Sequence, residues 1–128
     1  DWKIQFLKGN ETADIIYFVT HGAIKNWNPQ EALDFVKTHI KIPVITCEDF
    51  MMPYAVFGKT KIAIEQGFWA AKVAKMILEG ANPADFPVIS NQLSATWLNT
   101  SLAQLIQFVP DTSDFTDLKL VEEPDWAH

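Results

Sequence analysis

The chain has 128 residues, 48% of them hydrophobic, which is enough to bury one core and no more. Ten lysines, no arginine and sixteen carboxylates give a net charge of −6, and this balance excludes the basic surface that nucleic-acid binding requires. No apolar run approaches the roughly 18 residues of a membrane-spanning helix. The single cysteine, Cys47, excludes an internal disulfide and a cysteine-rich zinc site.

The first predicted elements are extended. Trp2, Ile4 and Phe6 alternate with polar residues in the segment 1–11, and this period of two predicts a strand or an extended edge. Residues 13–20 form an almost continuous run of β-branched and aromatic side chains. Such a run is typical of a strand that is buried on both faces of a parallel sheet.

A helix and a second strand follow. Asn28 is placed as an N-cap, with Pro29 at the first helical position and Glu31 two residues later, a form of capping box. The helix is expected from Pro29 to about His39, before Pro43. The next buried strand is 44–47. Strand, crossover helix and strand at these lengths predict a right-handed βαβ unit.

The second half of the chain repeats this alternation. A third strand is expected near 60–64 and a fourth near 95–98, the fourth followed by a helix with Asn99 as its N-cap. Between them lies a long helix that ends at Gly80 in the C′ position, with Asn82-Pro83 as a stop signal. Its apolar stripe is expected to lie flat on a sheet, with Lys72, Lys75 and Glu79 on the solvated side; the stripe consists of Ala70, Val73, Ala74 and Ile77.

The carboxyl-terminal segment is acidic. Between Asp111 and Asp125 six acids are opposed by Lys119 alone, which predicts an exposed tail over 111–128 after a single α/β lobe over 1–110. The scattered apolar side chains of this segment indicate that it packs on something; they are Phe115, Leu118, Leu120 and Trp126.

The predicted fold is a three-layer αβα sandwich around a mainly parallel sheet. Ligands of open α/β sheets bind at the carboxyl ends of the strands, where the chain has Thr20, His21 and Gly22 after one strand and Glu48, Asp49 and Phe50 after the next. Gly22 leaves room for a ligand, His21 can donate or accept, and either carboxylate could hold an ammonium group. With Trp27 and Tyr54, Phe50 could form a stacking surface. The set suits an amino acid or a similar small polar metabolite.

Other interpretations of these residues stay open. His21 can be an ordinary loop residue, and Glu48-Asp49 can cap the next helical turn. Phe50, Met51 and Met52 can be packing residues, as we expect for Trp69. His21, Cys47 and Asp49 also outline a thiol hydrolase, although no nucleophile signature surrounds Cys47. The sequence has no glycine-rich phosphate loop and no metal-ligand spacing, so we expect no cofactor and no metal.

Several short segments carry a family resemblance. In order, they are Gly67, Ala70-Ala71, Ile77-Leu78-Glu79-Gly80, the run from Pro83 to Val88, Leu98-Asn99 and Leu102-Ala103. Their order and spacing resemble the C-terminal lobe of type I periplasmic substrate-binding proteins of ABC transporters, in particular the uncharacterised and aromatic-amino-acid-type branch. The bulk of Phe68-Trp69 beside Gly67 and the acidic tail depart from the family pattern.

The resemblance implies a function without a reaction. It implies an extracytoplasmic lobe that binds a small solute together with an amino-terminal lobe missing here, and that delivers the solute to a membrane permease. The alternatives are the ligand-sensing domain of an extracytoplasmic receptor and the small thiol hydrolase that uses Cys47. A single lobe presents half a cleft and bare interlobe surface, so we expect the fragment to self-associate.

Overall fold

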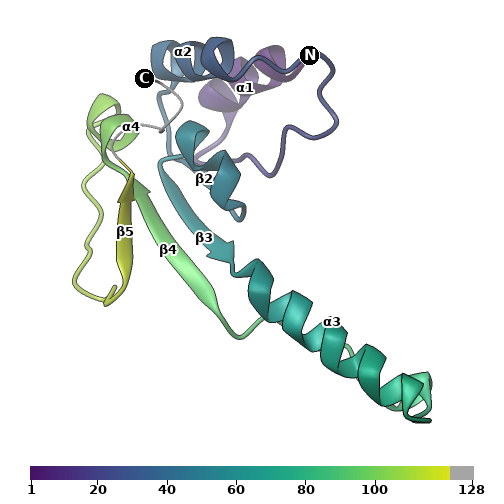
Figure 1. Cartoon of the computed structure of the whole chain (residues 1–128). Helices are drawn as coiled ribbons and strands as arrows, with labels where there is room; N and C mark the ends of the chain where they lie inside the picture. Colours follow the sequence, from purple (N-terminus) through teal and green to yellow (C-terminus); the bar gives the residue numbers. More distant parts are fainter. Residues whose placement is uncertain (122–128) are drawn as a thin grey trace. The chain divides into compact units, whose positions relative to one another are not determined.

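The computed structural model describes residues 1–121, and these residues divide into two compact units (Figure 1). Unit 1 combines Asp1–Thr60 with the chain from Ala95 onward, and unit 2 is Lys61–Ser94. Residues 122–128, including the acids and Trp126 of the expected tail, lie outside the described residues.

A five-stranded sheet in the order β1-β2-β3-β4-β5 forms the centre of unit 1. The strands are β1 (Ile16–Tyr17), β2 (Val44–Thr46), β3 (Phe57–Lys61), β4 (Ser94–Asn99) and β5 (Leu118–Val121). The β1/β2, β2/β3 and β4/β5 pairs are parallel. The predicted α/β class with a mainly parallel sheet flanked by helices is therefore confirmed.

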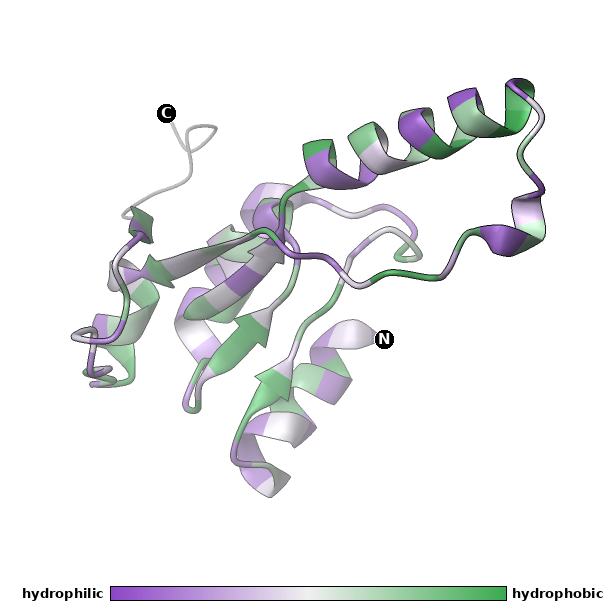
Figure 2. Cartoon of the chain, turned by 90° about the horizontal axis from the view of Figure 1, so that it is seen from below, coloured by the Kyte–Doolittle hydropathy of each residue, from purple (hydrophilic) through white to green (hydrophobic). Residues whose placement is uncertain are grey.

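Helices supply the rest of the core. α1 (Trp2–Thr12), α2 (Pro29–His39), α4 (Thr100–Leu105) and the 3₁₀ helix η1 (Asp49–Tyr54) each bury apolar side chains in one cluster with β2 and β4. The most completely buried of these side chains include Val36, Val44, Met51 and Leu102. Figure 2 shows strong apolar colouring on the short strands β1 and β2, and apolar and polar colouring alternating along the helices.

The amino-terminal segment is a helix, and the expected strand over residues 1–11 is wrong. Asp1 caps α1 by accepting a hydrogen bond from the backbone N–H of Lys3. Phe6 and Asn10, one helical turn apart, are its buried positions, whereas Ile4 is exposed. Three alternating residues are too short a pattern to separate period 2 from period 3.6, and contacts with distant rings select the helix.

β1 is shorter and less buried than predicted. It lies at the edge of the sheet with two paired residues, Ile16 opposite Val44 and Tyr17 opposite Ile45. Ile16 and Phe18 pack on the core, but Tyr17 is 56% exposed, and its same-side neighbours Ile15 and Val19 are exposed as well. The expectation of burial on both faces is therefore wrong for this strand.

The predicted caps are confirmed in unit 1. The Asn28 side chain accepts from the N–H of Glu31, with Pro29 at the first turn, and α2 ends at His39 as expected. The Asn99 side chain accepts from the N–H of Leu102 and starts α4. Caps were predictable because their hydrogen bonds join residues only three positions apart.

The long helix of unit 2 begins earlier than predicted. α3 covers Ala63–Leu78, so residues 62–64 are not strand and Gly67 lies inside the helix. Gly80 follows the helix with a φ of 103°, the left-handed conformation predicted for it. A short 3₁₀ turn, η2 (Pro83–Asp85), capped by Asn82, then starts the return toward β4.

The face of α3 that meets the return segment differs from the expected stripe. Its half-buried positions are Glu65, Trp69, Val73 and Ile77, spaced every four residues, while Ala70 and Ala74 are exposed. Both carboxylate oxygens of Glu65 accept backbone N–H groups, from Gln92 at 2.8 Å and from Leu93 at 2.9 Å. No residue of unit 2 is buried, so the predicted flat packing of the alanine stripe on a sheet is not found.

Part of the acidic segment belongs to the sheet. β5 pairs with β4 from Thr96 opposite Leu118 to Asn99 opposite Val121, and the ring of Phe115 lies 5.7 Å from that of Phe57. The expectation that its apolar residues pack on something is met for Phe115 and Leu118, whereas Leu120 is 59% exposed. Hydrogen bonds from Ser113 hold the pKa of the Asp111 carboxyl below its usual value at the start of this segment.

Candidate functional site

The loops after β1 and β2 leave the same edge of the sheet. The two strands are parallel neighbours in register, so Thr20–Gly22 and Glu48–Phe50 both follow carboxyl ends of adjacent strands. This is the position in an open α/β sheet where ligands are bound.

Ring contacts join the two loops. The His21 imidazole stacks on the Trp27 indole with ring centres 4.8 Å apart and planes 12° apart. Phe50 approaches His21 edge-on at 5.6 Å and is 50% exposed. A hydrogen bond from the N–H of Ile24 to the carbonyl of His21 closes a turn in the loop between His21 and Trp27. We call His21, Trp27 and Phe50 the aromatic shelf.

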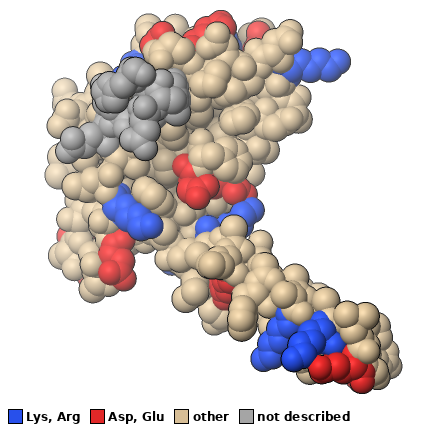
Figure 3. All heavy atoms as spheres, viewed as in Figure 1, with Lys and Arg blue, Asp and Glu red and all other residues tan. Residues whose placement is uncertain are grey.

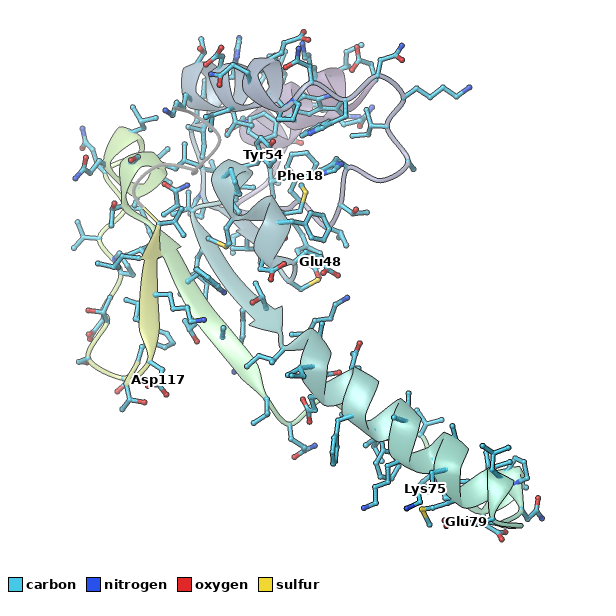
Figure 4. The ribbon with its side chains drawn as sticks, in the orientation of Figure 1. Phe18, Glu48, Tyr54, Lys75, Glu79 and Asp117 are labelled. Atoms are coloured by element: carbon cyan, nitrogen blue, oxygen red, sulfur yellow. The ribbon has the colours of Figure 1, made fainter. Side chains whose placement is uncertain are left out.

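Buried and half-buried rings pack against Trp27 and hold the shelf in place. Trp27 contacts Trp2 and Tyr54, each at 5.2 Å, and Phe18 at 6.3 Å; Figure 4 shows Phe18 and Tyr54 side by side, with Glu48 beyond them. Tyr54 is only 2% exposed, and burial raises its pKa. Its expected role in stacking on a ligand is therefore wrong: Tyr54 is a core residue that holds Trp27 in place.

The carboxylates next to the shelf differ in their surroundings. Glu48 is half-buried at the N-cap position of η1, and its side chain makes no capping hydrogen bond. Asp49 is exposed, and its Oδ1 accepts from the N–H of Phe50 at 2.8 Å. Met51 and Met52 are buried, which confirms that they are packing residues; Phe50 is half exposed, and its packing against a second lobe stays a prediction.

Thr20 and Gly22 form a small turn. The Thr20 hydroxyl accepts from the N–H of Gly22 at 3.1 Å, and both residues are exposed. A methyl group added at Gly22 would meet only this hydroxyl, at 3.5 Å. Unit 1 alone therefore gives no steric reason for a glycine at this position.

Sequence reasoning missed the neighbour of Cys47. A hydrogen bond with the Cys47 thiol, followed by smaller effects of burial and of the nearby charges, raises the pKa of the Tyr17 phenol. Tyr17 lies in β1 and Cys47 directly follows the neighbouring strand β2, so the predicted βαβ pairing could have indicated their proximity. The ring contacts of His21 are with Trp27 and Phe50, so the geometry does not favour the thiol-hydrolase outline.

The expected site residues line an open surface. A hollow of about 480 Å³ lies beside the shelf, between the start of α1 and the loop 24–28, and of the shelf residues it includes Trp27.

Among residues 1–121, no three histidine, cysteine or carboxylate side chains gather as metal ligands would. In the same part of the chain, no helix combines the length and the apolar character needed to cross a bilayer.

Comparison with known proteins gives a clear structural likeness and no sequence match. No protein-family model and no curated protein matches the chain. A conserved domain protein from Vibrio cholerae O1 biovar El Tor aligns with a TM-score of 0.66 at 20% identity over 91% of this chain and 40% of its own. For a ligand-free, open substrate binding protein with adhesive properties from Clostridium difficile, the values are 0.62, 17%, 96% and 41%. For a Streptococcus pneumonia ABC domain in complex with L-Trp, they are 0.64, 18%, 93% and 41%.

These likenesses define the class of fold. The chain shares its α/β fold with part of each of these solved chains, one of which is a substrate binding protein, and this likeness of fold agrees with the resemblance in the sequence. It spans about two fifths of the length of the solved chains that it matches.

Proposed function

We propose that this chain is part of an extracytoplasmic solute-binding protein of an ABC-type transport system and that it performs no chemical reaction. The ligand is a small polar metabolite such as an amino acid. The observation that carries the proposal is the aromatic shelf, which stands at the carboxyl edge of parallel strands in a fold similar to that of substrate-binding proteins.

The shelf supplies one wall of the binding site. His21 and Phe50 offer ring surfaces to a flat or apolar part of the ligand, and Asp49 offers a carboxylate to an ammonium group. Thr20, Gly22 and Glu48 complete the edge of this wall. Because binding sites cover most of a ligand's surface, a second, amino-terminal lobe closes over the shelf, and a permease receives the ligand from the closed protein.

Ligand screening tests the proposal. The complete gene product is screened by thermal shift against the twenty amino acids and a panel of small carboxylates. A true ligand at 100 times its Kd stabilises the folded state by about 2.7 kcal/mol. If no compound in the panel shifts the melting temperature, the proposed ligand class is wrong.

Two substitutions locate the site once a ligand is found. Phe50→Ala and His21→Ala each remove a ring of the shelf, so each weakens binding about tenfold, as expected for one aromatic contact of ~1.5 kcal/mol. The matched control is Phe115→Ala, which removes another partly exposed ring and leaves Kd unchanged. Wild-type affinity in Phe50→Ala and His21→Ala would place the ligand elsewhere.

A further inference from the structure

The outward side of α3 carries an apolar surface with no cover among the described residues. Opposite the half-buried face of this helix, apolar positions recur at i, i+3, i+4 and i+7, the spacing of a helix face that packs. Ile64 is 77% exposed, Phe68 74% and Leu78 88%. We define the outer face of α3 as Ile64, Gly67, Phe68, Ala71, Ala74 and Leu78.

Charge is nearly absent from this face. The lysines and acids of unit 2 visible in Figure 3 gather mainly toward the end of α3 where Lys75 and Glu79 lie (labelled in Figure 4), and these two form an ion pair. Lys75, one turn after Ala71 and just before Leu78, is the one charged residue among these apolar positions. A surface of this composition fits an apolar protein interior and not an anionic partner or solvent.

Gly67 supplies an independent observation. It lies inside a 16-residue helix, where glycine weakens a helix relative to alanine. A methyl group added to Gly67 would meet nothing within 4 Å, so the described structure contains no steric reason for the glycine. A body that approaches the helix backbone closely would give one.

The structural matches indicate which polypeptide covers the outer face of α3. They cover 91–96% of this chain, and the unmatched part is too short to contain unit 2. Most of unit 2 therefore has a counterpart in folds whose remaining three fifths are absent from the present sequence. A helix without any buried residue is not stable by itself, and in the longer proteins it has more polypeptide available to cover it.

We propose that the outer face of α3 is the docking surface for the second lobe of the same polypeptide, so that unit 2 packs as a piece of that lobe. The proposal rests on the proposed two-lobed function. The lobe expected over residues 1–110 then consists of unit 1 alone, and the chain passes to the second lobe at Thr60–Lys61 and returns at Ser94–Ala95. In the isolated 128-residue chain the outer face is bare and promotes self-association.

Thiol labelling measures whether the face is covered. In a Cys47→Ala background of the complete gene product, Phe68→Cys and Ala71→Cys report on the outer face, and Gln66→Cys on the same helix is the exposed control. Labelling of the two outer-face cysteines is at least 100-fold slower than that of the control, and independent of protein concentration. In the 128-residue chain at low concentration the three rates are similar. Equal rates in the complete gene product overturn the proposal, as does protection that depends on a second copy of the chain.

Gly67→Ala gives a second readout that does not need a reactive thiol. If the face were bare, the better helix former would raise the melting temperature of the complete gene product. If the second lobe docks closely on Gly67, the added methyl group obstructs the contact, and Gly67→Ala lowers the melting temperature. A rise in Gly67→Ala contradicts the proposal.

These outcomes separate the two proposals. If the outer-face cysteines are labelled slowly and the screen finds no ligand, the docking surface is supported and the proposal of an amino-acid ligand is wrong. A ligand that binds while Phe68→Cys is labelled rapidly retains the function and removes the docking surface.

Discussion

The contact between Tyr17 and Cys47 shows how a parallel register sets the properties of single residues. Tyr17 faces Ile45 across the β1/β2 pair, and Cys47 is two positions further along, on the same side of the sheet. The hydrogen bond between phenol and thiol favours the neutral phenol, which is why the pKa of Tyr17 lies above the ordinary value of a tyrosine.

Cys47→Ala is predicted to lower the pKa of Tyr17 toward 10.0. Titration of the phenolate absorbance measures it in a Tyr54→Phe background, which leaves one tyrosine. Below pH 10 both folded and unfolded chains keep Tyr17 neutral; above it the unfolded chain ionises first, so the Tyr17 contribution to stability falls as pH rises. An unchanged titration in Cys47→Ala would show that the thiol has no part in the shift.

Local chemistry made some residues predictable and left others hidden. Asn28, Asn99 and Gly80 were placed correctly because each satisfies a requirement of its own helix end. Tyr54 looked like a loop aromatic, and only the fold reveals that it packs beneath Trp27. The contact between His21 and Phe50 joins two loops, so sequence could name the loops but not the shelf.

At the scale of elements, α1 depends on contacts that are distant in sequence. The buried side chain of Asn10 donates to the carbonyl of Phe6 and accepts from the N–H groups of Lys41 and Ile42, at 2.7 and 3.3 Å. It thereby ties the end of α1 to the connection between α2 and β2. These hydrogen bonds and the ring contacts of Trp2 stabilise α1, and none of them is visible in the local sequence pattern. That pattern therefore predicted a strand in place of α1.

Asn10→Ala is predicted to destabilise the protein by about 1–3 kcal/mol, because it leaves the N–H groups of Lys41 and Ile42 without their acceptor. Denaturant unfolding measures the change. Thr12→Ala, two residues further along α1, is the control: it removes an exposed hydrogen bond from the Thr12 hydroxyl to the carbonyl of Lys8 and costs no more than about 0.5 kcal/mol. Equal effects of the two substitutions would mean that Asn10 does not anchor α1.

At the scale of the whole molecule, the sheet is made from two parts of the sequence. β3 and β4 are neighbours in the sheet, and the N–H of Asn99 donates to the carbonyl of Val56 at 2.8 Å. The indole N–H of Trp97 also donates to the buried hydroxyl of Thr60 at 2.9 Å. The sequence indicated the alternation of strands and helices, but it could not indicate that Lys61–Ser94 forms a unit without a core of its own.

Cleavage in unit 2 is predicted to leave unit 1 intact. A Glu-specific protease cutting after the exposed Glu79 breaks the chain between β3 and β4, and the hydrogen bonds between these strands hold the two pieces together. The nicked pieces co-elute in gel filtration of the 128-residue chain and separate only in denaturant. Separation under native conditions would show that the β3/β4 contacts cannot hold unit 1 by themselves.

The two backbone hydrogen bonds accepted by Glu65 have a consequence for how the protein folds. They join the first turn of α3 to Gln92 and Leu93, which lie just before β4. They therefore bring together the two ends of the segment that connects β3 to β4. Bringing β3 beside β4 otherwise costs the closure entropy of the whole excursion, which grows as about (3/2)RT ln n. If the Glu65 hydrogen bonds form early in folding, the entropy of closing this segment is already lost when β3 meets β4. The two strands can then pair as fast as the strands of a short hairpin.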